Sequence, residues 1–210
     1  MNPTQRERLR WAGLSMLGLI AGLALALPLG VPIFAVLGAM VGTPVVLSIV
    51  GLGLGTAQWP IIRRHISSSG WWIVASVLGM AVGLTAGVIL VEQIARATSG
   101  GQPNFRMLGI VARAASFGTI GAIAGASLGL SQWLVLRRYV RDCRNWIAVN
   151  AWSLGVGLAS GSLLADALVP RSGSVPSVGI LLVVGGSVVG ASTAKALTSI
   201  FPSVVFAEGH

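Results

Sequence analysis

Six long apolar stretches divide the chain, and short segments that carry most of its charge separate them. The stretches cover about residues 11–30, 34–59, 71–91, 114–136, 146–167 and 178–200. A helix of ~20 residues covers the ~30 Å hydrocarbon core of a bilayer, which is close to the length of each stretch. We therefore expect an all-α integral membrane protein, a single domain over residues 1–210 with six transmembrane helices.

The stretches also repeat. Gln58-Trp59-x-x-Ile62-Arg63-Arg64 returns 74 residues later as Gln132-Trp133-x-x-Leu136-Arg137-Arg138, which defines two units at about 34–91 and 114–167. A third unit is split between the two ends, 178–200 followed in register by 11–30. A repeat of this kind specifies the structural unit. It predicts three pseudo-repeated helical hairpins, which pair the second stretch with the third, the fourth with the fifth, and the first with the sixth.

Composition and charge agree with a membrane protein. Hydrophobic residues make up 54% of the chain and charged residues 9%, and the mean hydropathy is +0.86. Ten of the fourteen Lys and Arg residues fall on one side of the predicted spans, so the positive-inside rule places both termini in the cytoplasm of a cytoplasmic-type inner membrane. This asymmetry accounts for the net charge of +9, and no nucleic-acid partner is needed to explain it.

Glycines spaced four residues apart occur in every stretch. They are Gly18/Gly22, Gly38/Gly42, Gly51/Gly55, Gly79/Gly83/Gly87, Gly121/Gly125/Gly129, Gly157/Gly161 and Gly186/Gly190. Apolar side chains do not drive helices together in lipid, so close backbone approach at small residues must contribute. The spacing predicts a tightly packed bundle of the glycine-zipper type.

Three polar residues extend these glycine faces. Gln58 and Gln132 lie seven residues after Gly51 and Gly125, and Thr193 lies at the matching place of the split unit. Their helical phase directs them into the same helix contacts as the glycines. One interpretation is an interhelical hydrogen bond that locks one end of the bundle. The other is a polar ring around a pseudo-threefold axis that gates a path.

A band of arginine and tryptophan marks the predicted cytoplasmic boundary. Indoles at a bilayer interface bury their rings and hydrogen-bond at headgroup level, and juxtamembrane arginines attract anionic headgroups. We expect these residues to face lipid headgroups. The residues concerned are Arg63, Arg64, Arg137, Arg138, Trp59, Trp72, Trp133 and Trp146, with Trp11 and Trp71 at the same level.

The residues for catalysis are few. The chain has two histidines, one cysteine and five acidic residues, and no acid falls at the middle of a predicted span. No nucleophile with its base, metal cluster or phosphate loop can be assembled from them. We therefore expect no enzymatic activity, cofactor or metal, and we expect His65, in a turn rich in arginine, to be a solvated headgroup residue.

The repeated Gln-Trp-x-x-(Ile/Leu)-Arg-Arg motif, followed by Trp and a glycine-rich span, resembles a group of uncharacterised, cyanobacterial-type multi-pass membrane proteins. The resemblance covers residues 51–90 and 125–164, and it implies a topology but no activity. We expect a non-enzymatic scaffold, accessory or assembly subunit that contacts lipid, pigment or another membrane complex, with a homo-oligomer as a further possible assembly. The alternative is a channel or transporter for a small neutral or weakly polar solute along the pseudo-threefold axis.

Overall fold

The computed structural model describes residues 3–98, 109–140, 143–168 and 174–200. Within these residues the chain forms five helices: α1 (Pro3–Ile62), α2 (Gly70–Thr98), α3 (Ile110–Leu136), α4 (Asn145–Leu168) and α5 (Ser174–Ile200). By length and composition, all five could cross a membrane. The protein is thus all-α, and its helices are those of a membrane protein.

The first helix differs from the prediction. α1 spans 60 residues and continues through residues 31–33, where the sequence suggests a break between two spans. The chain reverses instead at Gly38, whose φ of 68° and ψ of 174° are not helical. Glycine adopts a positive φ without steric cost because it has no Cβ. The structure therefore has five helices and not the six separate helices that the sequence predicts.

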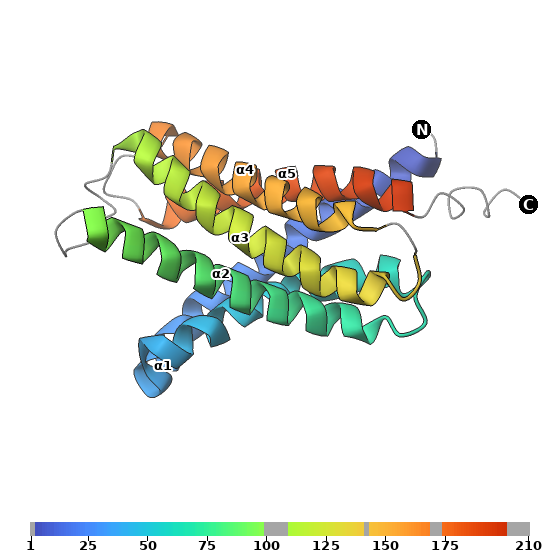
Figure 1. Ribbon diagram of the computed structural model, residues 1–210, viewed down its shortest axis with the longest axis horizontal. Coiled ribbons are helices and arrows are strands. Elements are labelled where there is room, and N and C mark those ends of the chain that lie inside the picture. The colour runs from blue at the N-terminus through green and yellow to red at the C-terminus, as the bar shows by residue number, and fades with distance from the viewer. Residues whose placement is uncertain (1–2, 99–108, 141–142, 169–173, 201–210) are drawn as a thin grey trace, which may run out of the picture.

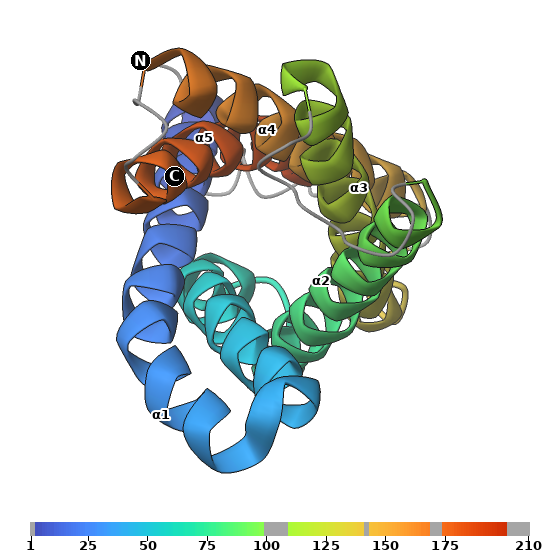
Figure 2. The ribbon, with the colours of Figure 1, turned by 90° about the vertical axis from the view of Figure 1, so that its left-hand side faces the viewer.

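The two arms of α1, residues 3–37 and 39–62, pack against each other. A Cβ built on Gly18 would lie 2.7 Å from the Cβ of Ala57, and one built on Gly22 would lie 2.9 Å from the Cα of Val50. Figure 2 shows the two arms running side by side up to the reversal. The 60 residues of α1 thus form a helical hairpin that turns at Gly38.

The helices form a closed ring in chain order. α2 contacts α1 and α3, α4 contacts α3 and α5, and α5 returns to α1. Seen along the bundle, the helices surround a common centre (Figure 2). The start of α1 and the end of α5 lie at the same end of the bundle, on the right of Figure 1. That end also carries Arg63, Arg64, Arg137 and Arg138, and we call it the basic end.

Glycines lie at each contact of this ring. Gly51 and Gly55 of α1 face α2, Gly79, Gly83 and Gly87 of α2 face α3, Gly121, Gly125 and Gly129 of α3 face α4, Gly157 of α4 faces Gly185 of α5, and Gly186 and Gly190 of α5 face the first arm of α1. A Cβ at most of these places would lie 3.0 Å or less from an atom of the neighbouring helix, whereas at Gly186 the nearest atom, in Met16, is 3.3 Å away. Gly38 is different, because no atom lies within 4 Å of a Cβ built there. It serves the reversal and not a helix contact.

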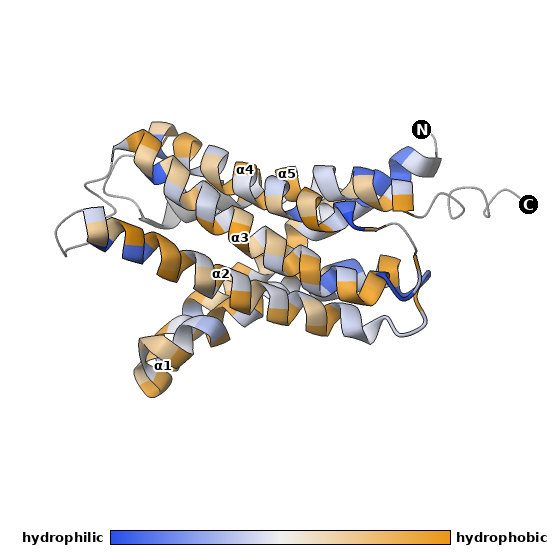
Figure 3. Ribbon diagram, in the orientation of Figure 1, coloured by the Kyte–Doolittle hydropathy of each residue, from blue (hydrophilic) through white to orange (hydrophobic). Residues whose placement is uncertain are grey.

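The outer surface of the bundle is apolar. Large hydrophobic side chains are exposed on all five helices, including Leu17, Val82, Leu130, Trp152 and Val183. Figure 3 shows hydrophobic residues along the length of the helices and hydrophilic residues gathered toward the ends. A helix that is apolar on all sides is typical of a protein surrounded by lipid.

Candidate functional site

Three tryptophans meet on the axis of the bundle near the basic end. Trp11 of α1, Trp72 of α2 and Trp146 of α4 have ring centroids 5.9–6.3 Å apart and are at most 1% exposed. Two of the three pairs are edge-to-face, an arrangement that contributes about 0.5–1.5 kcal/mol per pair beyond the burial of surface. We call these three residues the indole cluster.

The indole cluster corrects one expectation. The sequence predicts that Trp11, Trp72 and Trp146 lie at the bilayer interface, but the structure buries all three between helices. Each helix directs its tryptophan inward because glycines or other small residues on the same face bring that face against its neighbours. The distribution of tryptophans along a chain shows their depth in a membrane but not the side of the helix that faces lipid.

Each indole of the cluster donates a hydrogen bond to a polar residue of a neighbouring segment. Trp72 Nε1 donates to Gln58 Oε1 at 3.1 Å, and Trp146 Nε1 donates to Gln132 Oε1 at 2.9 Å. Both bonds join residues 14 apart in the chain. The third indole joins the first arm of α1 to α5, because Trp11 Nε1 donates to Thr193 Oγ1 at 2.9 Å.

The two glutamines use their remaining amide groups in the same way. Gln58 Nε2 donates to Ser15 Oγ at 2.9 Å, and Gln132 Nε2 donates to Ser76 Oγ at 3.0 Å. Gln58, Gln132 and Thr193 are all at most 2% exposed. The structure thus brings together the three polar residues singled out from the sequence, and each bonds laterally to adjacent helical segments. Such bonds hold helices together in lipid.

A layered pattern along three helices went unrecognised in the sequence. Each clustered tryptophan is followed four residues later by a buried polar residue, Ser15, Ser76 or Asn150, and eight residues later by a buried Leu19, Met80 or Leu154. Residues four and eight apart lie on nearly the same face of a helix. A search for Trp followed at these intervals would have identified Asn150 and the inward orientation of the tryptophans.

An apolar cavity of about 120 Å³ lies at the level of the leucine and methionine layer. Its lining comes from both arms of α1 and from α2, α4 and α5: Leu19, Leu23, Leu47, Val50, Met80, Leu84, Leu154, Leu158, Gly185, Gly186 and Val189. No polar side chain is among these residues. The cavity therefore suits an apolar occupant and offers nothing that would bind an ion.

The arginines at the basic end follow two different patterns. Arg63 lies over the Trp59 ring at 4.7 Å and Arg137 lies over the Trp133 ring at 5.1 Å, within the range of cation–π attraction. Trp59 also donates to Ser69 at 3.0 Å. Trp59 and Trp133 are half-buried, so their rings serve as platforms for arginine.

The second arginine of each pair has no such platform. Arg64 lies 3.8 Å from the carboxylate of Glu7 on the first arm of α1, whereas Arg138 lines a groove between α2 and α3. All four arginines are exposed, as headgroup contacts require.

Two titratable groups lie in the turns of the basic end. Burial lowers the pKa of His65 below its ordinary 6.5, and Arg64 adds to the effect while Glu7 opposes it. His65 is thus not the fully solvated residue expected from its sequence context. The pKa of Tyr139 is lowered mainly by hydrogen bonding to Ser68 and then to Ser67, which links the turn after α3 to the turn before α2.

The opposite end of the bundle carries the remaining described ion pairs. Arg113 of α3 lies 2.9 Å from Asp166 of α4, and Arg96 lies 3.4 Å from Glu92 within α2. Glu7, Glu92 and Asp166 are the acidic residues in the part of the chain that the structure describes, and each lies beside an arginine other than Arg138.

Comparison of the chain with protein-family models, with curated proteins and with solved structures finds no match. The resemblance to cyanobacterial-type multi-pass proteins stays a prediction.

Proposed function

We propose that this protein is a non-enzymatic membrane scaffold, an accessory or assembly subunit whose bundle is closed to solutes along its axis. The indole cluster carries this proposal. An axial path would have to pass between three rings that touch one another and are almost fully buried. The indole N–H groups and both glutamine amides are engaged in lateral hydrogen bonds, so they bind the helices together and not a passing solute.

In this proposal the chain crosses the membrane six times, because α1 crosses twice. Its arms of about 35 and 24 residues reach some 52 and 36 Å at ~1.5 Å per residue, and each exceeds a ~30 Å hydrocarbon core. The positive-inside rule assigns the basic end, and with it both termini, to the cytoplasm of the inner membrane.

The same proposal includes three pseudo-repeated hairpins with glycine-zipper packing. Two observations support it. The bonds from Trp72 to Gln58 and from Gln58 to Ser15 have counterparts from Trp146 to Gln132 and from Gln132 to Ser76. Glycines lie at each helix contact, where they allow the backbones to approach closely. In the third hairpin, Thr193 takes the position of the glutamine and accepts a hydrogen bond from the Trp11 indole.

The partner surface of such a scaffold is its lateral face. Trp152 is 70% exposed and lies about 9 Å further along α4 than Trp146, toward the middle of the bilayer. A large apolar ring at that depth fits lipid, a pigment or another membrane subunit. The proposal therefore expects the protein to occur in a larger membrane complex or a homo-oligomer.

One observation favours the alternative, a channel for a small neutral or weakly polar solute. The cavity of about 120 Å³ gathers residues from four helices around the axis, two layers along the helices from the indole cluster. In a channel, this cavity would be a chamber and the indole cluster its gate. The buried ring of Gln58, Gln132 and Thr193 would then contact the solute when the gate opens.

Flux in liposomes separates the two proposals. Purified protein is reconstituted, and the entry of water, glycerol and urea is followed by stopped-flow light scattering against protein-free vesicles. The scaffold predicts no added flux for the wild type or for Gln58→Leu/Gln132→Leu. Flux in the wild type that this double variant abolishes or alters, with Gln93→Leu as an exposed control, would support the channel. A second arm extracts native membranes in mild detergent, where the scaffold must migrate in an assembly heavier than the purified 21.5 kDa chain in the same detergent.

A further inference from the structure

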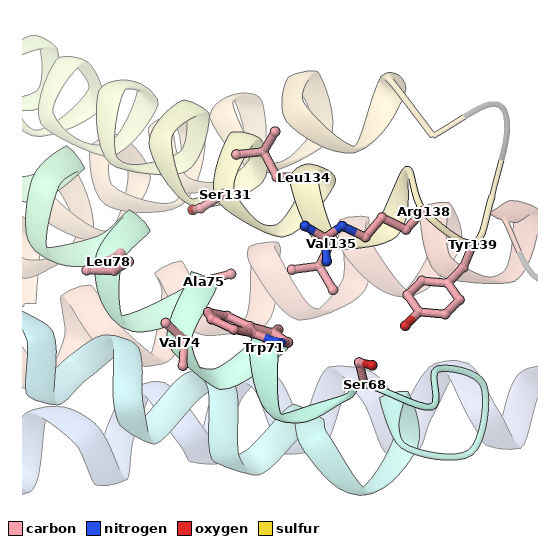
Figure 4. A pocket seen from close by; sticks show the side chains of 10 residues that line it. All are labelled: Ser68, Trp71, Val74, Ala75, Leu78, Ser131, Leu134, Val135, Arg138 and Tyr139. Atoms are coloured by element: carbon pink, nitrogen blue, oxygen red, sulfur yellow. The ribbon is translucent and has the colours of Figure 1, made fainter.

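A groove on the lateral face of the bundle lies between α2 and α3 at the basic end (Figure 4). It has a volume of about 190 Å³. Its lining residues are Ser68, Trp71, Val74, Ala75, Leu78, Ser131, Leu134, Val135, Arg138 and Tyr139. The groove opens to the outside of the ring, so its occupant comes from the membrane and not from the axis.

The groove is apolar inside and polar at its mouth. Trp71, Val74 and Leu78 on α2 stand opposite Leu134 and Val135 on α3, along about 10 Å of helix. Several of these side chains lack cover from the protein, with Trp71 59% and Leu78 56% exposed. At the mouth, Figure 4 shows the Arg138 guanidinium reaching back over Val135 and the Tyr139 hydroxyl directed toward Ser68.

Arg138 is the charged group that distinguishes this groove. Arg64, the repeat counterpart of Arg138, lies 3.8 Å from the Glu7 carboxylate. Arg137, next to Arg138 in the chain, lies over the Trp133 ring. The three acidic residues that the structure describes all lie beside other arginines. Among the described residues, then, Arg138 has no carboxylate to neutralise it, and its five donors face an open, partly apolar groove.

We propose that this groove binds one anionic phospholipid, with the phosphate on the Arg138 guanidinium and an acyl chain along Val74, Leu78 and Leu134. This inference rests on the proposed function, because it requires the basic end to lie at headgroup level. Arginine binds phosphate through two parallel N–H donors. The Tyr139 oxygen accepts from Ser68 at the same mouth, so the Tyr139 O–H is left to donate to a remaining phosphate oxygen. A free phosphate ion would make no favourable contact with the apolar walls of the groove, whereas an acyl chain would.

The test measures which lipid stays on the protein. Full-length protein is equilibrated in detergent with equal amounts of phosphatidylglycerol and phosphatidylcholine of identical acyl chains, and retained lipid is counted by native mass spectrometry. The wild type should retain phosphatidylglycerol preferentially. Arg138→Gln should lower that preference about fivefold, the effect of about 1 kcal/mol for one juxtamembrane arginine. Arg64→Gln is the matched control and should keep the preference.

Two further measurements make the result specific. Leu134→Gln places an amide in the apolar wall and should weaken retention of phosphatidylglycerol, and an unchanged melting temperature excludes unfolding as the cause. Soluble glycerol 3-phosphate should not displace the lipid. Equal losses in Arg64→Gln and Arg138→Gln, displacement by glycerol 3-phosphate, or dimerisation of the protein with loss of lipid would each overturn the proposal. None of these outcomes alters the liposome flux on which the scaffold proposal is tested.

Discussion

Single residues decide how the basic end of the bundle is held together. Gln132 accepts from the Trp146 indole and donates to Ser76, so one amide joins α3 to α4 and to α2. Gln58, on the second arm of α1, accepts from Trp72 of α2 and donates to Ser15 on the first arm of α1. Because each glutamine bonds an indole, replacement by an apolar residue leaves a buried N–H without a partner. A buried donor in that state costs about 1–3 kcal/mol.

A double-mutant cycle tests this pairing. Gln132→Leu should destabilise the protein by about 1–3 kcal/mol, because it orphans the Trp146 N–H. Adding Trp146→Phe removes that N–H, so the double variant should cost less than the sum of the single variants, with a coupling of about 0.5–3 kcal/mol. Unfolding in detergent, followed by intrinsic fluorescence, measures all four proteins. Strictly additive losses would show that the two side chains do not interact.

We expect His65 to make the stability of the protein depend on pH. Burial lowers its pKa in the folded protein below 6.5, so the unfolded chain binds the proton more tightly. The contribution of His65 to the free energy of unfolding is therefore fully present above pH 6.5 and is lost as the pH falls below that value. The melting temperature of the wild type should therefore decrease from pH 7.5 to pH 5.5. His65→Gln should flatten that decrease, and an unchanged slope in this variant would assign the effect to another group.

At the scale of the helices, glycine sets which faces meet. A Cβ on Gly83 would lie 2.7 Å from the Cα of Ala124, and one on Gly125 would lie 2.8 Å from the Cα of Ala151. Both places press backbone against backbone, where a side chain cannot be accommodated by a rotamer change alone. Among the described residues other than its chain neighbours, Gly109, just before α3, has no atom within 4 Å of such a Cβ. The same residue type thus has two different roles in neighbouring segments.

Substitution at these glycines should reveal the difference. Gly83→Leu or Gly125→Leu must separate two helices, and we expect each to cost at least the 1–3 kcal/mol typical of an overpacked core. Gly109→Leu should leave stability within about 0.5 kcal/mol of the wild type. Thermal unfolding in one detergent compares the three variants. A loss at Gly109 equal to that at Gly83 would contradict the assignment of the helix contacts.

At the scale of the whole molecule, the reversal at Gly38 determines the topology. If α1 crosses the membrane twice, its turn lies on the side opposite to the basic end. Met40 is highly exposed near that turn, Ala97 is exposed near the end of α2, and Ser68 is exposed at the basic end. These three positions therefore report the two sides of the membrane.

Cysteine labelling with a membrane-impermeant reagent tests this topology. In a Cys143→Ala background, Met40→Cys and Ala97→Cys should react in intact cells, whereas Ser68→Cys should react only after the membrane is opened. Labelling of Met40→Cys and Ser68→Cys from the same side would mean that α1 does not cross twice. The six-crossing proposal would then be withdrawn, although the helix contacts within the bundle would stand.

The candidate site was predictable in part. Helical phase directs Gln58, Gln132 and Thr193 toward the glycine faces, and the structure buries all three. Their bonding partners were not predictable, because the indoles of Trp72 and Trp146 reach them from other helices, and sequence distance says nothing about that approach. The reversal at Gly38 was missed because this glycine matches the four-residue spacing of the packing glycines, and only its backbone angles distinguish it.

The sequence by itself determined that the protein is helical and apolar enough for a membrane, because length and hydropathy are local properties of each stretch. It also determined which residue types repeat. Only the tertiary structure decided that three tryptophans are buried between helices and that the first two stretches form a hairpin with its turn at Gly38. It also decided that Arg138 faces a groove while Arg64 faces a carboxylate. These outcomes depend on which helix faces come together, and that is a property of the assembled ring and not of any one segment.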